Sequence, residues 1–392
     1  MYSRLSLLFV FVSCFVSSRA AHGSPIVPAD AQVKKYLPLL QGKRVGLVIN
    51  QTSVVGDSTL LDMLLVRKVQ VKTIFVPEHG FRGLADAGAH IDNSVDSATG
   101  LPLISLYGSH KQPKQEELDT LDVLVYDLQD VGTRFYTYIS TLEYCLDACA
   151  AAGKQFIVLD RPNPNGFYID GPVLEKANTS FVGMQPIPIV YGMTAGEYAQ
   201  MLVGERWIAH AADAQLTVVP CSGYDHSRLY KLPVAPSPNL RTMAAIYAYP
   251  SLCLFEGTPI SVGRGTDLPF QQFGCPGFAG HFTYHFTPQA GPGAKNPPYE
   301  RKECFGETVG DEQQLLRTLS GHLHLAWLIK AYAAYPEKNK FFTPFFTKLS
   351  GTASLMEQVA NGKTEQEIRK SWEPALSAFK LIRKKYLLYK DF

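Results

Sequence analysis

Short apolar segments alternate with segments of helical spacing along the first half of the chain, and this alternation restricts the folds that it can adopt. The predicted strands are residues 44–49, 69–76, 103–106, 121–126, 156–159 and 216–219. The predicted helices are residues 57–65, with Asp57 as N-cap, 141–152 and 195–203. Alternating strands and helices form βαβ units whose strands pair in parallel. We therefore predict a doubly wound, Rossmann-like α/β domain with a mostly parallel sheet.

Polar residues follow four of the first five predicted strands. They are Asn50-Gln51, Glu78-His79, Asp127 with Asp130, and Asp160-Arg161. The carboxyl ends of parallel strands meet at one edge of a sheet, where open α/β folds bind their ligands. The sequence therefore predicts that these residues converge on a functional site.

The segment Val76-Pro-Glu-His-Gly-Phe-Arg-Gly83 is the most informative of these strand ends. Pro77 ends the buried strand because proline has no N–H to donate to a neighbouring strand. A carboxylate, an imidazole and a guanidinium follow, between glycines that allow the backbone to turn tightly. The structural alternative is a solvated loop in which Glu78 pairs with Arg82.

Several functions that such a fold supports lack their sequence motifs here. The first strand is not followed by G-x-G-x-x-G, no strand is followed by G-x-x-x-x-G-K-[ST], and G-x-S-x-G is absent. The formal charge is +2 without a long Lys/Arg run, and no Cys/His spacing matches a zinc site. The sequence therefore argues against dinucleotide, nucleic-acid and structural zinc binding.

The chain divides into a targeting segment and two domains. Residues 1–22 carry a short apolar run and then small residues, which predicts a signal peptide and an exported, periplasmic or secreted protein. Cys14 weakly resembles a lipoprotein attachment site, so a lipid anchor is an alternative. A proline-rich stretch at 232–240 predicts a catalytic domain at 23–230 and a smaller C-terminal α+β domain at 231–392.

Two pairs of cysteines have different expected environments. Cys145 and Cys149 lie four residues apart on a predicted helix, which is typical of buried, small apolar side chains. Cys275 and Cys304 flank a loop-rich region and form the preferred disulfide pair, because export permits disulfides.

Seven internal motifs and the C-terminal Tyr386-Leu-Leu-Tyr389 match a known family. The motifs are Gly46-Leu-Val-Ile-Asn-Gln-Thr52, Pro77-Glu-His-Gly-Phe-Arg-Gly83, Tyr126-Asp-Leu-Gln-Asp-Val-Gly-Thr-Arg-Phe-Tyr-Thr-Tyr138, Leu159-Asp-Arg-Pro-Asn-Pro-Asn-Gly166, Pro236-Ser-Pro-Asn-Leu240, Phe255-Glu-Gly-Thr258 and Gly263-Arg-Gly-Thr266. They resemble the motifs of the exo-β-N-acetylmuramidases (NamZ-type glycoside hydrolases), with no departure within them. The resemblance covers essentially the whole chain beyond the signal segment.

This resemblance implies a Rossmann-like domain, a smaller C-terminal domain and a cleft between them. It implies a hydrolase that releases terminal, non-reducing N-acetylmuramic acid from peptidoglycan fragments in cell-wall turnover. No metal or organic cofactor is implied. By motif, the catalytic glutamate of the family falls on Glu78.

The hydrolysis of a glycoside needs a proton donor and a second group that acts at the anomeric carbon. Glu78 is the expected donor, since burial near aromatic residues raises the pKa of a carboxyl. Asp127, Asp130 and Asp160 are candidates for the second carboxylate, and Asp130 and Asp160 are the two that we predict to be catalytic. A structural ion pair is an alternative for Asp160. The acetamido group of the substrate itself is a further alternative.

Recognition of the lactyl carboxylate of N-acetylmuramic acid favours arginine, which binds a carboxylate through two hydrogen bonds. The candidate substrate-binding residues are His79, Arg82, Asp127, Arg134, Tyr136, Arg161, Asn163, Asn239, Glu256 and Arg264. For the arginines, structural ion pairs at the domain interface are an equal alternative, and for the asparagines, turn formation.

Two other classes of protein remain open at this point. A non-catalytic cell-wall sugar-binding protein could use the same cleft. A metal-dependent hydrolase could use Glu78, His79, Asp127 and Asp160 as ligands.

Overall fold

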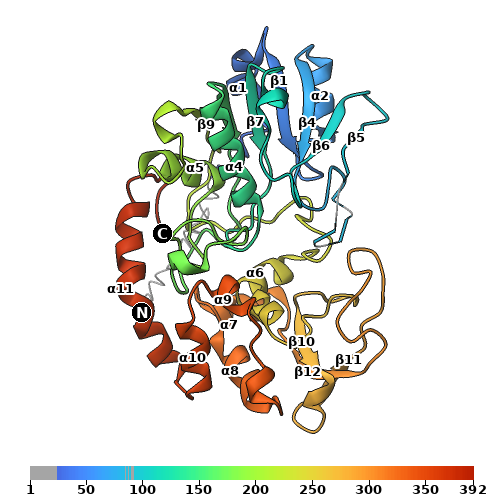
Figure 1. The fold of residues 1–392 in the computed structure, drawn as a ribbon, viewed down its shortest axis with the longest axis vertical. Helices are drawn as coiled ribbons and strands as arrows, with labels where there is room; N and C mark the ends of the chain where they lie inside the picture. Colours follow the sequence, from blue (N-terminus) through green and yellow to red (C-terminus); the bar gives the residue numbers. More distant parts are fainter. Residues whose placement is uncertain (1–23, 84, 87, 90–91) are drawn as a thin grey trace, which may run out of the picture.

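The computed structural model describes residues 24–392 except 84, 87 and 90–91, and it consists of two stacked domains (Figure 1). The expected signal peptide and Cys14 lie outside the described residues. In Figure 1 the sheet of the N-terminal domain is above and the C-terminal domain is below. No helix in the described part of the chain is long and apolar enough to cross a membrane.

The N-terminal domain is built on a seven-stranded sheet in the order β5-β6-β4-β1-β7-β8-β9. Its strands are β1 (Arg44–Ile49), β4 (Gln70–Val76), β5 (Ser94–Val95), β6 (Pro102–Ser105), β7 (Val123–Asp127), β8 (Gln155–Leu159) and β9 (Gln215–Val219). All neighbours pair in parallel except β5 with β6. The predicted doubly wound, mostly parallel sheet is therefore confirmed.

The direction of winding reverses beside the central strand β1. The chain runs from β1 to β4 and β6 on one side, then crosses to β7, β8 and β9 on the other. Loops that leave neighbouring strands on opposite sides of such a reversal open a crevice at the carboxyl edge of the sheet. The loops after β1 and β7 therefore flank the position where this fold binds ligands, and the loop after β4, the other neighbour of β1, lies next to them.

Helices cover both faces of the sheet, as the nearly continuous apolar strands require. Leu47 and Ile49 of β1 belong to one core cluster with α1 (Val33–Leu40) and α2 (Leu60–Val66), whereas Val48 belongs to the other with α4 (Tyr138–Ala151) and α5 (Ala195–Gly204). The short β2 (Val54–Val55), β3 (Ser58–Thr59) and α3 (Gln115–Leu118) complete the regular elements of this domain, with 3-10 turns at Lys176–Asn178 and Ala211–Asp213.

Two helix starts test the capping predictions. The predicted capping box at α5 is confirmed, since Thr194 accepts a hydrogen bond from the Glu197 N–H and Glu197 accepts one from the Thr194 N–H. The prediction that Asp57 caps α2 was wrong. A β2–β3 hairpin occupies residues 54–59, and Thr59 is the N-cap, accepting from the Asp62 N–H.

The C-terminal domain combines a small antiparallel sheet with helices, as the sequence predicted. The sheet has the order β10-β12-β11, formed by Gln272–Cys275, Cys304–Thr308 and Tyr284–Phe286. The helices are α6 (Met243–Leu252), α7 (Glu312–Leu319), α8 (Leu325–Ala334), α9 (Phe346–Ser350), α10 (Ser354–Ala360) and α11 (Glu365–Arg383), with 3-10 turns at Cys253–Gly257, Pro276–Phe278 and Lys338–Lys340. Cys275 and Cys304 are buried free thiols, so the preferred disulfide is not formed.

The C-terminal residues return to the N-terminal domain and hold the two domains together. Tyr389 donates its hydroxyl hydrogen to Asp160 Oδ2 at 2.5 Å, and the Leu388 N–H donates to Glu197 Oε1 at 2.8 Å. Figure 1 shows α11 running along the side of the molecule and the C-terminus ending beside the upper domain. One continuous apolar cluster also runs through both domains. This packing fixes the junction at which the candidate site lies.

Candidate active site

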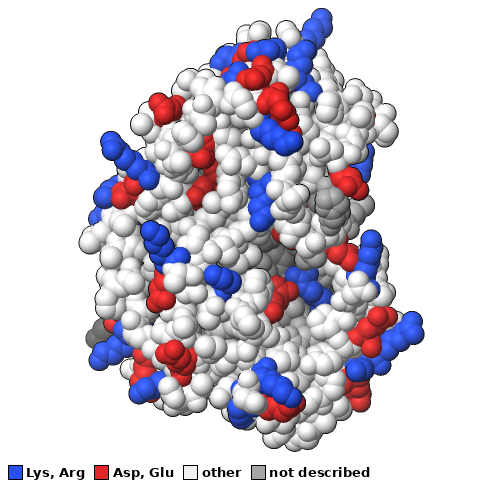
Figure 2. All heavy atoms as spheres, in the orientation of Figure 1, with Lys and Arg blue, Asp and Glu red and all other residues white. Residues whose placement is uncertain are grey.

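A cavity of about 190 Å³ lies at the junction of the two domains. The N-terminal domain lines it with Glu78, His79, Tyr107, Phe135, Tyr136, Thr137, Tyr138, Phe181 and Val182, and the rest of its wall includes Ser237, Tyr249, Glu256, Arg264, Phe270, Phe345 and Leu349. Figure 2 shows the surface hollowed between the upper and lower halves, with acidic and basic side chains next to each other at the hollow. The cavity thus combines aromatic walls with a few charged groups, as ligand sites usually do.

Glu78 enters this cavity because β4 ends at Val76 and the chain turns sharply after Pro77. His79, Gly80 and Gly83 all have positive φ angles, of 72°, 75° and 65°. Positive φ is strained for a non-glycine residue such as His79, a feature that concentrates at functional sites. A Cβ atom at Gly83 would lie 2.2 Å from the Gln51 side chain, so only glycine allows the loop to pack there.

Hydrogen bonds fix both oxygens of the half-buried Glu78 carboxyl. Thr137 donates its hydroxyl hydrogen to Oε2 at 2.8 Å, and the Gly88 N–H donates to Oε1 at 3.0 Å. The Tyr107 hydroxyl also bonds to Glu78, and burial together with this carboxylate raises the pKa of Tyr107. The alternative ion pair with Arg82 is not formed, because the exposed Arg82 guanidinium lies 3.9 Å from Asp96 instead.

His79 is a buried, neutral imidazole beside Glu78. Burial lowers its pKa, although the Glu78 carboxylate acts in the opposite direction. Nδ1 lies 2.7 Å from the Ala85 carbonyl oxygen, and a carbonyl only accepts, so the proton is on Nδ1. The Nε2 atom of the neutral ring is then a hydrogen-bond acceptor.

The loop after β7 supplies a second wall of the cavity. The Tyr136 hydroxyl donates to the Pro236 carbonyl oxygen at 2.9 Å, which ties this loop to the segment that leads into the C-terminal domain. The Asn50 amide donates to the Tyr138 hydroxyl oxygen at 2.8 Å, so the polar end of β1 supports the aromatic wall rather than entering the cavity. Tyr136 and Tyr138 pack edge to face with ring centroids 4.7 Å apart. This wall is rigid and aromatic.

The C-terminal domain contributes a guanidinium to the cavity. Arg264 Nε donates to Glu256 Oε1 at 2.7 Å, and its guanidinium carbon lies 5.0 Å from the centroid of the Phe270 ring. Burial opposes the charge of Arg264, but the Glu256 carboxylate more than offsets it and raises the arginine pKa. Arg264 is therefore a fixed cation in the cavity wall, and Glu256 and Glu78 are the two carboxylates among its described lining residues.

Asp127 and Arg161 lie away from this cavity, in a buried ion-pair cluster. Arg161 donates to Asp127 through Nε at 2.6 Å and Nη2 at 3.0 Å, and to Asp30 through Nη2 at 2.7 Å. Burial lowers the pKa of Arg161, but the two carboxylates raise it by more, so the net shift is upward. The predicted substrate contacts of Asp127 and Arg161 are therefore not supported by their positions, because the two side chains are buried in an ion pair and neither lines the cavity.

Asp160 is likewise enclosed by protein. Its carboxyl accepts hydrogen bonds from the Thr194 hydroxyl at 2.7 Å, the Gly196 N–H at 2.8 Å and the Tyr389 hydroxyl. Burial raises its pKa to about 6. The structure thus assigns Asp160 to the start of α5 and to the C-terminal segment, and it does not bring this predicted catalytic residue to the cavity.

Asp130 is also buried, behind the aromatic wall. Its Oδ2 accepts from the Gly132 N–H at 2.6 Å and from the Tyr191 hydroxyl, and burial raises its pKa to about 6. Asp130 is absent from the cavity lining, so its predicted role as the second catalytic carboxylate is not supported by the geometry.

Arg134 joins the domains rather than facing a ligand. Its guanidinium donates to the carbonyl oxygens of Pro172, Ile187 and Leu349, at 2.9, 2.7 and 2.8 Å. Burial lowers its pKa to about 9. Since Leu349 of α9 lines the cavity, Arg134 positions one wall of the site without touching its interior.

The two predicted asparagines hold loops. The Asn163 amide donates to the Met193 carbonyl oxygen at 2.8 Å while its side-chain oxygen accepts from the Asn165 N–H at 2.8 Å. The Asn239 amide donates to the Gly293 carbonyl oxygen at 2.8 Å. Both match the turn-forming alternative and neither lines the cavity.

The predicted sites therefore separate into two groups. Of the proposed residues, Glu78, His79, Tyr136, Glu256 and Arg264 line one cavity. The metal-dependent alternative required Asp127 and Asp160 beside Glu78 and His79, and the structure does not bring these four together. Across the described ranges, no group of three or more His, Cys, Asp or Glu side chains has a metal-binding arrangement.

Several lining residues were missed by the sequence analysis. Tyr107 follows the third predicted strand directly, so its strand-end position was a usable signal. Thr137 lies in one of the family motifs, but only the fold turns its hydroxyl towards Glu78. Tyr249 and Phe345 reach the cavity from segments that carried no signal beyond their aromatic character.

The chain forms a two-domain α/β protein, and the Glu78 carboxylate and the Arg264 guanidinium face one small cavity between the two domains. This arrangement is typical of an enzyme active site. Comparisons with known proteins give the family. The chain belongs to the NamZ exo-β-N-acetylmuramidases, since the family models of the N-terminal and C-terminal domains match residues 45–244 and 247–389.

Individual relatives agree with this assignment. The chain is 38% identical over 381 residues to the peptidoglycan β-N-acetylmuramidase NamZ of Bacillus subtilis (strain 168), covering 92% of this chain and 90% of that protein. Crystal structures of two DUF1343 family proteins from Bacteroides fragilis NCTC 9343 have the same fold. One is 45% identical with a TM-score of 0.87, covering 94% of this chain and 100% of its own, and the other is 30% identical with a TM-score of 0.78, covering 93% and 99%.

Proposed function

We propose that this protein is an exo-acting glycosidase that releases terminal, non-reducing β-linked N-acetylmuramic acid from peptidoglycan fragments. The observation that carries the proposal is the cavity at the domain junction, in which Glu78 and Arg264 enter from different domains. Membership of the NamZ family supports the reaction and its substrate class.

Glu78 protonates the leaving glycosidic oxygen in this proposal. Thr137 and the Gly88 N–H hold its two oxygens in place, so the carboxyl enters the reaction already oriented. Once a sugar occupies the cavity, the aromatic residues around Glu78 exclude water, which strengthens the electrostatic interactions of Glu78 with the reacting bond.

Arg264 binds the lactyl carboxylate that distinguishes N-acetylmuramic acid from N-acetylglucosamine. Its Nε is occupied by Glu256, whereas its two terminal nitrogens bond to none of the described residues. Two parallel N–H groups of a guanidinium match the two oxygens of a carboxylate. Glu256 thereby positions the Arg264 guanidinium that recognises the substrate.

The reaction also needs a group that acts at the anomeric carbon. Because Asp127, Asp130 and Asp160 are enclosed by protein, the two candidates for this role are Glu256 and the acetamido group of the substrate. Glu256 is ion-paired with Arg264, whereas Glu78 is the only carboxyl of the described lining without a guanidinium partner.

We also propose that the protein works outside the cytoplasm, in the periplasm or as a secreted enzyme, after removal of residues 1–22 as a signal peptide. The proposed substrate lies there, and the amino-terminal sequence has the length and composition of a signal peptide. A lipid anchor at Cys14 and the domain limits 23–230 and 231–392 remain predictions from the sequence.

The direct test compares two chromogenic substrates that differ only in the lactyl ether. The purified mature chain is incubated with a β-N-acetylmuraminide and the matching β-N-acetylglucosaminide. The proposal predicts chromophore release from the first and little from the second. No release from the muraminide, or equal release from both, would overturn it.

A further inference from the structure

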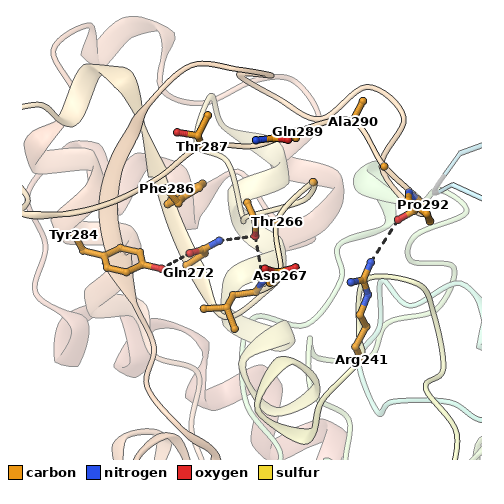
Figure 3. A pocket seen from close by; sticks show the side chains of 13 residues that line it. Arg241, Thr266, Asp267, Gln272, Tyr284, Phe286, Thr287, Gln289, Ala290 and Pro292 are labelled. Atoms are coloured by element: carbon orange, nitrogen blue, oxygen red, sulfur yellow. Dashed lines mark hydrogen bonds between the residues drawn. The ribbon is translucent and has the colours of Figure 1, made fainter.

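A second depression lies in the C-terminal domain, separate from the active-site cavity (Figure 3). It has a volume of about 500 Å³ and lies between the loop 265–268, the segment 287–292 and the small antiparallel sheet. We call it the distal groove. Arg264 lines the active-site cavity and the next residue, Gly265, lines the distal groove, so a single loop separates the two.

A chain of hydrogen bonds orders the floor of the distal groove. The Tyr284 hydroxyl donates to Gln272 Oε1 at 2.5 Å, and Gln272 Nε2 donates to the Thr266 hydroxyl oxygen at 2.6 Å. Figure 3 shows this chain running from the Tyr284 ring across the floor. Gln272 is 1% exposed, and the ring of Phe286 adds apolar surface beside it. The floor is therefore preformed, with aromatic and polar surface side by side.

The rim of the groove carries two opposite charges. Arg241 is held through Nε, which donates to the Pro238 carbonyl oxygen at 2.7 Å, and Asp267 is exposed on the facing loop. Neither forms an ion pair with another residue in the described part of the chain. Gln289, whose N–H donates to the Gly265 carbonyl oxygen at 2.8 Å, adds an amide to the same rim.

We propose that the distal groove binds sugar units of the departing glycan strand, which makes the enzyme more efficient on longer fragments. A sugar ring presents an apolar face that packs on aromatic rings, and neighbouring hydroxyls that planar guanidinium, carboxylate and amide groups bind in pairs. The groove offers both kinds of surface. A peptide-free strand also carries a lactyl carboxylate on each N-acetylmuramic acid, and the Arg241 guanidinium at the rim can bind such a group.

This inference rests on the proposed function and extends it. In the proposed function the cavity at the domain junction, of about 190 Å³, holds the terminal sugar, and the remaining sugars of a fragment extend beyond it. A depression lined by Arg264, Gly293 and Lys295 adjoins the cavity, and Gly291 and Pro292 of the same segment line the distal groove. A longer fragment can therefore extend from the cavity along this segment into the distal groove.

The test measures kcat/KM on peptide-free glycans of two, four and six sugars, each ending in a non-reducing N-acetylmuramic acid. We expect wild type to favour the hexasaccharide over the disaccharide by about tenfold, the effect of one charged hydrogen bond. Arg241→Met and Asp267→Asn should each lower this ratio towards one. Arg317→Met, at an exposed position of α7 outside the groove, is the matched control and should keep the wild-type ratio.

The outcomes separate the inference from the function on which it rests. No release of N-acetylmuramic acid from any glycan would overturn the proposed function. Release with equal kcat/KM for all three lengths, or a length preference that both groove variants retain, would overturn the distal subsite alone. A parallel series of glycans with intact peptide stems tests whether the groove binds sugar or peptide. A higher kcat/KM for longer glycans seen only in that series would show that the groove binds peptide, and it would overturn the assignment to sugar.

Discussion

Two sets of strand-end loops look alike in sequence and differ in their environment. After β4, the chain turns outward through His79 and Gly80, and Glu78 reaches the cavity. After β7 and β8, Asp130 and Asp160 turn inward and are enclosed by hydroxyl and N–H groups of the protein. A polar residue at the end of a parallel strand is thus placed near the ligand edge, but the following loop decides whether it meets solvent or protein.

The largest expected difference between the two sets is catalytic. Glu78→Gln removes the proton donor while keeping its size and its bond from Thr137, and kcat should fall by about 10²- to 10⁴-fold. Binding of the muraminide should persist, as measured by titration. A variant that keeps the wild-type kcat would show that another group donates the proton.

The strand-end residues that turn inward, such as Asp127 and Arg161, should stabilise the fold rather than take part in catalysis. Arg161→Met leaves the carboxylates of Asp127 and Asp30 buried without their cation, and we expect the free energy of unfolding to fall by about 3–5 kcal/mol in urea titrations. Arg161→Lys should recover part of this loss, because lysine keeps the charge but not the fork of donors. The activity of the folded fraction should stay near wild type, and a selective rise in KM would return Arg161 to a substrate role.

On the cavity side, Arg264 should control specificity. Arg264→Met should lower kcat/KM for the muraminide about 30-fold, since a charged bidentate contact contributes about 2 kcal/mol. The rate on the glucosaminide should change far less, so the ratio of the two substrates is the measurement. An equal loss on both would place Arg264 in packing rather than recognition.

The smallest effect concerns the pH dependence at Asp130. The unfolded chain releases this proton near its ordinary pKa of 3.8, whereas burial raises the pKa to about 6 in the folded chain. The folded chain therefore binds more protons between these values, and the free energy of unfolding falls as the pH rises from about 4 to about 6.

Asp130→Asn removes this loss while keeping an oxygen for the Gly132 N–H and the Tyr191 hydroxyl. It should be more stable than wild type above pH 6, by about 1–2 kcal/mol, in thermal unfolding followed at pH 5 and pH 8. Its kcat should remain near wild type. A loss of activity similar to that of Glu78→Gln would restore Asp130 as a catalytic residue.

The sequence predicted the sheet and its edge because strand and helix periodicities are local properties. Six predicted strands match β1, β4, β6, β7, β8 and β9 within a few residues. The sequence could not show which strand-end residues line the cavity and which bond to protein. The partners of Asp160 and Arg161, which are Tyr389 and Asp30, come from distant segments of the chain. Likewise, the sequence predicted that Arg134 binds the ligand, whereas in the structure Arg134 donates a hydrogen bond to the Leu349 carbonyl oxygen.

A crystal structure of Glu78→Gln with a bound muramic-acid-terminated disaccharide tests the central claim most directly. The account predicts the terminal sugar in the cavity at the domain junction, with the glycosidic oxygen within about 2.6–3.2 Å of the residue 78 side chain and the lactyl carboxylate on Arg264. A sugar bound elsewhere, or one whose glycosidic oxygen lies beside Asp130 or Asp160, would contradict it.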